Sequence, residues 1–574
     1  MREPKEPGYT LVCMDGASNL KLLVYKSDTL EFVMAVDTES NQMVVNKGGI
    51  VYNNFGQECK WFDSAIAGLA KEYRQNIDAF ASVARGATGC YVGKGRKGDK
   101  GDRLLDGVIG GAGEDLTMSY AQHRPGVLEL FQKIAPDQVA FFNETGAWYG
   151  AGITWGIRGL ELQTSKELRE QAAAFCAQHI LMTGYLLGGK HLRAAAVAGG
   201  EISYGLCHSG IYNTDTGGLS SFAKSPEMGP FRRLYLQGGK KGYVIAGEMP
   251  GDKRRALGVE GRCGVVFGGH DTTLSHIPVL TAYQQALLPA YLRAHKGKTQ
   301  VIHVEVGSWI LAKQLGGRPV KVPKNGHESG LLAQGSVDGQ PGLTSLYGGG
   351  FDFRELKGRV EVKLGKGSFK PKADQADEEL LMQIASAADT FVLPNISSTS
   401  KGTGPWTKVK GTIINEEKFF RDSETALILS NLMTAITTAT HVNLITKTKE
   451  DTPIVLTGGG AKDPYYGRLL ATLTGRTVYV MEDKNGKKVI ETTGLGAAMM
   501  AKAALEGKHP TQVDLKPLGI TFHKQEAFTD KTARAIEKYR ERFMEHIRTT
   551  LGDRPQMLSP ETTRKQPARE RRRQ

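Results

Sequence analysis

An acidic residue next to a histidine follows an apolar run near the middle of the chain. Residues 268–273 read Gly-Gly-His-Asp-Thr-Thr and come directly after Val-Val-Phe at 265–267. Paired glycines predict a turn in which the backbone can approach a ligand closely, and Asp271 could accept the proton of a hydroxyl nucleophile. An aspartate followed by threonines is also typical of a helix N-terminus. The motif alone therefore leaves a catalytic and a structural interpretation open.

Three other glycine turns follow predicted strands and could bind an anion. They contain Gly16, Ser18 and Asn19 (residues 15–19), Gly307 and Ser308 (306–309), and Gly458, Gly459 and Gly460 (457–460). Backbone N–H groups and small hydroxyls in such turns can point toward phosphate oxygens. One such turn is weak evidence, but their order around the Asp271 motif is a stronger indication of a phosphate-binding protein.

Two common nucleotide-binding motifs do not account for this site. Residues 93–98 fit G-x-G-x-x-G after a short apolar run, but the turn-like sequence that follows cannot begin a helix. We therefore expect a hairpin loop there and not a dinucleotide site. The pattern G-x-x-x-x-G-K-[ST] does not occur in the sequence, which excludes a P-loop kinase.

Size and composition predict a two-domain soluble enzyme. A chain of 574 residues is too long for one core. Its start does not resemble a signal peptide, and no run approaches 18 apolar residues, so no membrane partner is expected. The six cysteines lie far apart without a C-x-x-C pair, which indicates neither zinc nor a disulfide framework. A reduced, cytoplasmic enzyme fits best.

The net charge of +14 raises the question of nucleic-acid binding. Six of the positive charges lie in the segment 564–573, beside the single acid Glu570. That segment has no apolar periodicity, so it predicts a disordered basic tail. Because no basic helix with interleaved aromatic residues and no zinc-finger pattern occurs, we expect no specific nucleic-acid partner.

The predicted elements indicate two related α/β halves. Strands are expected at 9–14, 20–26 and 31–38, and helices at 61–75 and 164–183. Later, a strand at 453–460, a helix at 465–475, a strand at 477–482 and a small-residue helix at 494–507 follow one another. We expect an N-terminal domain over 1–275, a C-terminal domain over 276–551, and the tail over 552–574.

The ordered set of motifs resembles the FGGY family of carbohydrate kinases, within the actin-like ATPase superfamily. Residues 16–21 (GASNLK) are similar to the first phosphate loop, 268–273 to the loop of the catalytic aspartate, and 306–311 (VGSWIL) to the second phosphate loop. Residues 457–480 are similar to the adenosine-binding segment and 491–504 to the helix after it. The resemblance covers about residues 8–550 and is nearest to deoxyketose kinases such as rhamnulokinase. It implies an α/β fold of two actin-like (ribonuclease H-like) domains with a catalytic cleft between them.

The resemblance also implies the roles of individual residues. Asp271 would be the general base, and ATP and Mg²⁺ the cofactors. The implied ATP-binding residues are Gly16, Ser18, Asn19, Lys21, Gly307, Ser308, Gly458, Gly459, Gly460 and Asp463; the implied sugar-binding residues are His270, Gly86, Arg85 and His208; and the implied metal-binding residues are Asp15 and Asp271. His270 could instead be a core histidine, Lys21 an exposed strand lysine, and the aromatic residues Trp148, Tyr149 and Trp155 core residues instead of sugar-stacking ones.

The first phosphate loop departs from the family pattern. The family writes this loop as Asp-x-Gly, but here Met14 stands two positions before Gly16 and Asp15 stands next to it. Because adjacent strand side chains point to opposite faces, Asp15 would face away unless the turn bends early. Either Asp15 still serves, or ATP, waters and Asp271 hold the metal, or activity is weakened or lost. The family's Lys-x-x-Trp segment is also absent; TWGIRGLEL (154–162) lies where we expect it.

The function indicated is ATP-dependent phosphorylation of a ketose, deoxyketose or polyol. The alternative is a nucleotide- or sugar-binding protein of the same fold that has lost catalysis. A small-molecule sugar is the expected partner, and a homodimer is left open. Arg85 is unusual at the end of its strand and could pair with a polar or acidic substituent of the sugar.

Overall fold

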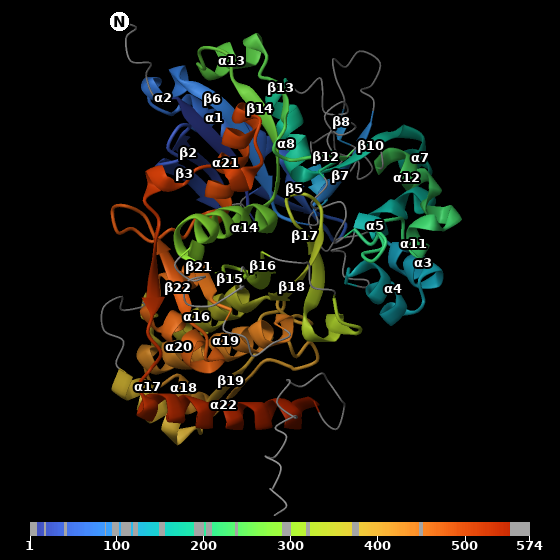
Figure 1. The fold of residues 1–574 in the computed structure, drawn as a ribbon. Coiled ribbons are helices and arrows are strands. Elements are labelled where there is room, and N and C mark those ends of the chain that lie inside the picture. The colour runs from blue at the N-terminus through green and yellow to red at the C-terminus, as the bar shows by residue number, and fades with distance from the viewer. Residues whose placement is uncertain are drawn as a thin grey trace, which may run out of the picture.

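The structure of the chain is a computed structural model with two large mixed sheets. It describes residues 8–16, 19–39, 43–86, 88–93, 103–104, 116–118, 124–148, 155–188, 200–201, 209–235, 239–289, 300–316, 322–369, 378–446 and 452–551. In Figure 1 the N-terminal sheet lies above helix α14 (Asp271–Ala282) and the C-terminal sheet lies below it.

The N-terminal sheet has the strand order β13-β14-β6-β1-β2-β3. Its strands are β1 (Tyr9–Asp15), β2 (Asn19–Lys26), β3 (Phe32–Glu39), β6 (Ile77–Ala84), β13 (Ile245–Glu248) and β14 (Gly264–His270). Strands β1, β6 and β14 are parallel, whereas β2, β3 and β13 pair antiparallel to their neighbours. The central strands are buried along most of their length, as expected for a sheet covered on both faces.

The C-terminal sheet repeats this connectivity, with the order β17-β18-β16-β15-β21-β22-β23. Its strands are β15 (Val301–Val306), β16 (Ile310–Leu315), β17 (Leu331–Gly335), β18 (Pro341–Tyr347), β21 (Ile454–Gly458), β22 (Val478–Glu482) and β23 (Thr521–Gln525). Strands β15, β21 and β22 are parallel, whereas β16, β17, β18 and β23 pair antiparallel to their neighbours. The expected α/β class with two related halves is therefore confirmed.

Local sequence signals explain where the helices begin and end. Helix α1 (Phe55–Ala67) starts at Asn54, whose side chain accepts the backbone N–H of Gln57, and α20 (Pro464–Thr474) starts at the cap Asp463 and ends at a left-handed Gly475. The segment 61–75 forms the end of α1 and the separate helix α2 (Lys71–Gln75). The other long helices are α8 (Gln178–Leu186), α16 (Gly349–Leu364), α17 (Glu378–Ala387), α19 (Ser423–Ile445), α21 (Thr492–Glu506) and α22 (Asp530–Leu551).

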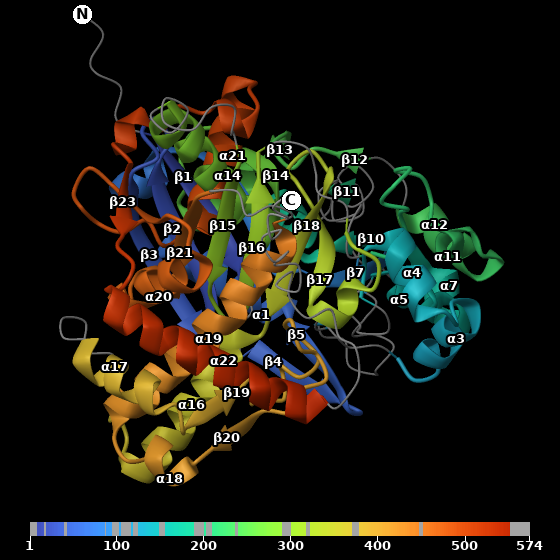
Figure 2. The same ribbon diagram turned by 60° about the horizontal axis from the view of Figure 1, so that its bottom comes forward.

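A peripheral lobe is inserted into the N-terminal half (Figure 2). It contains β7 (Gly89–Gly93), β8 (Arg103–Leu104), β10 (Ala172–Ala177), α3 (Val127–Ile134), α4 (Gln138–Thr145), α5 (Trp155–Gly159), α6 (Glu161–Thr164), α7 (Lys166–Gln171), α11 (Ser221–Lys224) and α12 (Gly229–Tyr235). The continuous helix expected at 164–183 is wrong, because Ala172–Ala177 pair with the antiparallel strand β7 between α7 and α8. Strands β7 and β8 are antiparallel, as the expected hairpin requires, and its loop lies outside the described residues.

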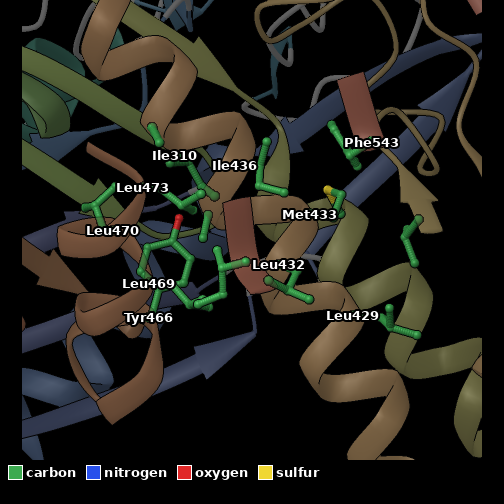
Figure 3. Packing of buried hydrophobic residues seen from close by; sticks show 14 of the residues in the cluster. Ile310, Leu429, Leu432, Met433, Ile436, Tyr466, Leu469, Leu470, Leu473 and Phe543 are labelled. Carbon is green, nitrogen blue, oxygen red and sulfur yellow. The ribbon is translucent and has the colours of Figure 1, made fainter. Parts of the chain in front are cut away.

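Three large apolar clusters of the described residues stabilise this arrangement. Figure 3 shows part of the C-terminal cluster, in which Leu432 and Ile436 of α19 lie against α20. A second cluster fills the N-terminal half. The third combines the N-terminal sheet, α14 and α21 with residues of the C-terminal sheet. Because α21 contacts β1, β6 and β14, a C-terminal helix covers the N-terminal sheet. The boundary expected at 275/276 falls inside α14.

Candidate active site

The carboxyl ends of three parallel strands meet at one edge of the N-terminal sheet. Asp15 of β1 is paired with Ala84 of β6, and Ala84 is paired with His270 of β14. This register brings Asp15, Arg85 and Asp271 to the same edge. Ligands of open α/β sheets bind at this edge because the connecting loops diverge there.

The end of β14 requires glycine. Gly268 has a φ of 73°, and a Cβ atom on it would lie 1.7 Å from the carbonyl oxygen of Ser82. The register of β14 against β6 shifts between Val266 and Gly269, which is where the strand bends. This bend carries the chain into α14, whose first residue is Asp271.

Asp271 occupies a helix N-terminus and retains partial exposure. Its Oδ1 accepts the backbone N–H of Thr272 at 2.7 Å and the hydroxyl of Thr272 at 3.2 Å. Burial raises the pKa of Asp271 to about 6, although Thr272 and Arg85 act to lower it. Its side chain is still 31% exposed. A carboxylate with these properties can serve as a general base near neutral pH.

His270 supports this carboxylate from the buried side. Burial, with the charge of Lys313 as a smaller cause, lowers the pKa of His270 to about 3, so the ring is neutral. Its Nε2 lies 3.1 Å from Asp271 Oδ1. An ionised carboxylate can only accept, so the neutral ring donates in this contact. The contact orients Asp271; the expected contact of His270 with a sugar stays a prediction.

Arg85 lies between two buried carboxylates. Its Nη2 donates to Asp15 Oδ1 at 2.8 Å and reaches Glu58 Oε1 at 3.5 Å. Gln178 donates to the other oxygen of Glu58 at 3.0 Å. Burial raises the pKa of Glu58 to about 8, and the charge of Asp15 adds to this rise. The guanidinium is thus engaged within the protein, and its expected contact with a sugar substituent stays a prediction.

Sequence reasoning missed Glu58 and Gln178. Glu58 is the fourth residue of α1, and Gln178 is the first residue of α8. Nothing in the spacing of these residues connects them to Arg85, which is 27 residues from Glu58 along the chain. An acid that helical periodicity places on the buried face of α1 is the one signal that points to an internal partner.

The glycine loops of the C-terminal half lie side by side. Strands β15 and β21 are parallel, with Val306 paired to Gly458. Gly458 has a φ of 73°, and a Cβ atom there would lie 2.6 Å from the carbonyl oxygen of Val306. This register brings the turn at Gly307 and Ser308 next to Gly458, Gly459 and Gly460. The loops that the sequence singled out therefore come together.

A cation that sequence reasoning missed faces the second loop. Arg354 of α16 donates from Nη2 to Ser308 Oγ at 3.1 Å. A Cβ atom on Gly350 would lie 2.1 Å from the carbonyl oxygen of Gly307, so α16 begins in direct contact with this loop. The glycine run at 348–350 is the sequence signal for this close approach.

Several expected ligands already have partners in the protein. Lys21 pairs with Glu491 at 2.5 Å. Asp463 accepts the backbone N–H of Tyr465 and the side-chain amide of Asn431, both at 2.8 Å, and so caps α20.

The remaining predicted residues are placed as follows. The carbonyl oxygen of Asn19 accepts the N–H of Gly16 at 3.1 Å, which closes the first turn. Gly86 directly follows Arg85 at the end of β6. Trp148 donates from Nε1 to the carbonyl oxygen of Leu331 at 3.2 Å and so joins the lobe to the C-terminal sheet. Ser18, His208, Tyr149, the side chain of Trp155 and the tail 552–574 lie outside the described residues.

The carboxylates at the N-terminal edge can be compared with what Mg²⁺ requires. Burial raises the pKa of Asp15, and Asp271 adds to the rise, whereas Arg85 opposes it. The Oδ2 atom of Asp15 is buried, and no donor of the described residues meets it at hydrogen-bond geometry. Within the described ranges, no group of three or more His, Cys, Asp or Glu residues is arranged to hold a metal. Mg²⁺ in phosphate-transfer sites is commonly bound by one or two carboxylates, waters and the phosphates of the substrate, and the Asp15 and Asp271 oxygens fit that role.

Comparison with known proteins gives a family match for the C-terminal half. Residues 298–509 match the family model described as carbohydrate kinase FGGY, C-terminal domain. Curated proteins give no match. Among the described helices, none is long and apolar enough to cross a membrane.

Solved structures resemble the chain over nearly its whole length. A carbohydrate kinase from Novosphingobium aromaticivorans has a TM-score of 0.65 at 18% identity and covers 94% of this chain and 99% of that chain. A xylulose kinase from Lactobacillus acidophilus has a TM-score of 0.66 at 15% identity, over 95% and 99% of the two chains. Plasmodium falciparum glycerol kinase with ADP has a TM-score of 0.66 at 12% identity, over 96% and 99%. Likeness at these identities shows the two-domain fold.

Proposed function

We propose that this chain, which belongs to the FGGY carbohydrate kinase family, transfers the γ-phosphoryl group of ATP to a hydroxyl of a small sugar or polyol with Asp271 as the general base. The observation that carries the proposal is the placement of Asp271 at the N-terminus of α14. Ser275 of that helix donates to Glu305 of β15, and β15 is paired with β21; the ends of these two strands form the glycine loops. The proposed base and the proposed phosphate-binding loops are thus connected through the contact of α14 with β15.

The protein's own residues account for the steps. Asp271 would take the proton of the attacking hydroxyl while that oxygen bonds to the γ-phosphorus and the bond to the β-phosphate oxygen breaks, leaving ADP. His270 would keep the carboxylate in place through its 3.1 Å contact. When bound, Mg²⁺ would neutralise phosphate charge, with Asp15 and Asp271 as its proposed protein neighbours.

We propose that backbone and side-chain donors bind the nucleotide on the other side. The N–H groups around Gly307 and the hydroxyl of Ser308 would meet phosphate oxygens, with Arg354 supplying a positive charge beside them. Gly458, Gly459 and Gly460 would leave room for the adenosine against the backbone. Because Lys21 is paired with Glu491, its contribution to the phosphates requires that this ion pair open.

The test is an ADP-release screen with MgATP over ketoses, deoxyketoses, glycerol and other polyols, and gluconate. Gluconate and glycerol belong in the panel because kinases of these compounds share the fold. We expect one class of acceptor to raise ADP release well above the rate without sugar. Absence of sugar-dependent release from the whole panel, in protein that binds MgADP, would contradict the kinase proposal. The rhamnulokinase branch stays a prediction that the deoxyketose members of this panel examine.

A second candidate function is nucleotide and sugar binding without turnover. The observation that favours it is the ion pair of Asp15 with Arg85, which occupies one of the two Asp15 oxygens. A protein of this kind would bind MgADP and a sugar in calorimetry but would release no ADP in the screen. The two candidates therefore agree in the binding measurement and give opposite results in the ADP-release screen.

A further inference from the structure

A chain of three buried polar side chains crosses from α14 to the C-terminal sheet. His276 Nδ1 lies 2.7 Å from His303 Nδ1, and His303 Nε2 lies 2.7 Å from Thr457 Oγ1. His276 is on α14, His303 on β15 and Thr457 on β21. His303 and Thr457 have no exposed surface, and His276 has 6%.

Both imidazole rings in this hydrogen-bonded series are neutral, so the donors of the series must all point the same way. Burial lowers the pKa of His303 to about 3 and that of His276 well below its usual value, with Lys313 as the next cause for each. A neutral imidazole has one N–H donor and one acceptor nitrogen. The two short contacts can therefore both be satisfied only if every donor in the chain points the same way, either toward Thr457 or away from it.

This hydrogen-bonded series connects the helix of Asp271 with the two glycine loops. His276 is five residues after Asp271 on the same helix, and Thr457 directly precedes Gly458. His303 lies on the strand that ends before Gly307. Two further bonds join α14 to the C-terminal sheet: Ser275 donates to Glu305 at 2.7 Å, and Thr273 donates to the carbonyl oxygen of Gly335 at 3.2 Å.

We propose that His303 is a positioning residue, which through His276 and Thr457 fixes the helix of Asp271 relative to the two glycine loops. This inference rests on the proposed function, since it assigns the loops to the nucleotide and Asp271 to the acceptor hydroxyl. Misplacing reacting groups by about 1 Å can cost about 10²-fold in rate, so a bond that only sets distance can have a large kinetic effect.

The first test removes one bond and keeps the volume. We expect Thr457→Val to lower kcat by roughly tenfold to 10²-fold while the Kd for MgADP changes by less than about threefold, because the loop backbone that meets the nucleotide is kept. The matched control is Thr437→Val, since Thr437 is also fully buried and its hydroxyl bonds only to its own helix, to the carbonyl oxygen of Met433 at 2.8 Å. Equal kcat values for the two variants would overturn the proposal.

The second test separates the two bonds of His303. In His303→Asn the amide can reach the position of Nδ1 and keep the bond to His276, whereas in His303→Gln it can reach the position of Nε2 and keep the bond to Thr457. We expect each variant to lower kcat by most of the amount that Thr457→Val lowers it. We expect His303→Asn combined with Thr457→Val to be no slower than either single variant. Additive losses would show independent structural effects and would overturn the proposal.

Hydrogen exchange measures the same connection without turnover. We expect MgADP to slow exchange in the peptides that cover 271–282 of the wild-type protein, and we expect this response to be lost in Thr457→Val at saturating MgADP. An equal response of α14 in both proteins would overturn the positioning role alone. Wild-type protein that fails to bind MgADP would instead overturn the proposed function, so the two failures are distinguishable.

Discussion

The two sheets differ in the kinds of residue at the edge where their parallel strands end. The N-terminal edge has buried ionisable side chains, with Arg85 between Asp15 and Glu58 and with His270 beside Asp271. The C-terminal edge is formed mainly by glycines and backbone, with Gly458 against Val306 and Gly350 against Gly307. The same strand connectivity thus supports an edge suited to proton transfer and an edge suited to binding phosphate.

This difference predicts that the two edges fail in different ways. A charge inside the N-terminal edge is stabilised only by its partners, so removing one charge leaves another unpaired. The C-terminal edge depends on space and on left-handed backbone, so it is sensitive to the addition of a single methyl group. Substitutions that change charge at constant volume, or volume at constant charge, therefore distinguish the two edges.

The largest expected effect is on turnover after Asp271→Asn. Loss of the basic carboxylate should lower kcat by about 10²–10⁴-fold, because general-base catalysis contributes about that much. Asparagine can still accept the bond from Thr272, so the melting temperature should stay near that of the wild type. Steady-state kinetics and a melting curve of the same preparation measure both.

The matched control for this substitution is Asp137→Asn. Asp137 also lies at a helix start, where its Oδ1 accepts the N–H groups of Val139 and Ala140 at 2.9 Å, but it lies in the peripheral lobe. We expect normal kcat in this variant. Near-normal turnover in a stable Asp271→Asn protein would show that another group is the base.

The second prediction tests, through the stability of the protein, the N-terminal edge with its buried ionisable side chains (the charged edge). Arg85→Met should lower the free energy of unfolding at pH 7 by about 3–5 kcal/mol, because it leaves the buried Asp15 without its cation and removes the donor that reaches Glu58 at 3.5 Å. Arg359→Met is the control, since Arg359 pairs with Glu355 on an exposed helix surface and should cost less than about 1 kcal/mol. Denaturant unfolding measures both, and similar costs would mean that burial does not distinguish the edges.

The glycine edge was the more predictable of the two from sequence. Gly307 directly follows β15 and Gly458 is the last residue of β21, so their turns can be expected from a few neighbouring residues. The charged edge depends on contacts between distant segments, such as Asp15 with Arg85, which are 70 residues apart. The register of β1 against β6 sets that contact. The hydrophobic periodicity of the sequence does not reveal which residues of two strands are paired.

The error at 164–183 has a similar cause. The run 172–177 is rich in alanine, which favours a helix in isolation. It forms a strand because the antiparallel strand β7 supplies hydrogen-bond partners. Tertiary pairing therefore overrides local propensity in the lobe, whereas the strands of the two large sheets follow their local sequence closely.

The third prediction tests the C-terminal edge, which is formed mainly by glycines (the glycine edge). Gly458 and Gly475 both have positive φ, at 73° and 65°. Gly475 has a ψ of 18°, in the left-handed helical region where alanine should cost about 1–2 kcal/mol, whereas Gly458 has a ψ of −158°, in a region that essentially only glycine adopts. Only at Gly458 would the new Cβ lie 2.6 Å from a carbonyl oxygen, whereas nothing lies within 4 Å of it at Gly475. We expect Gly458→Ala to weaken MgADP binding by about tenfold (roughly the effect of 1.4 kcal/mol) and Gly475→Ala to leave it unchanged. Calorimetry that gives equal affinities would mean that this loop is not close to the nucleotide.

The smallest expected effect is a pH dependence that belongs to the charged edge alone. With the pKa of Asp271 at about 6, its basic form is lost as the pH falls through 6, so kcat/KM should decline about tenfold per pH unit below that value. Stability should change in the opposite direction, because a carboxyl group with a folded pKa above 3.8 binds its proton more tightly in the folded protein, so its ionisation favours unfolding as the pH rises through 6. Glu58 and Glu305 are buried carboxyl groups able to obscure this, but with pKa values of about 8 both are already protonated near pH 6. Glu58→Gln should therefore leave the decline below pH 6 in place. A decline in kcat/KM that disappears in Glu58→Gln would assign it to Glu58 in place of Asp271.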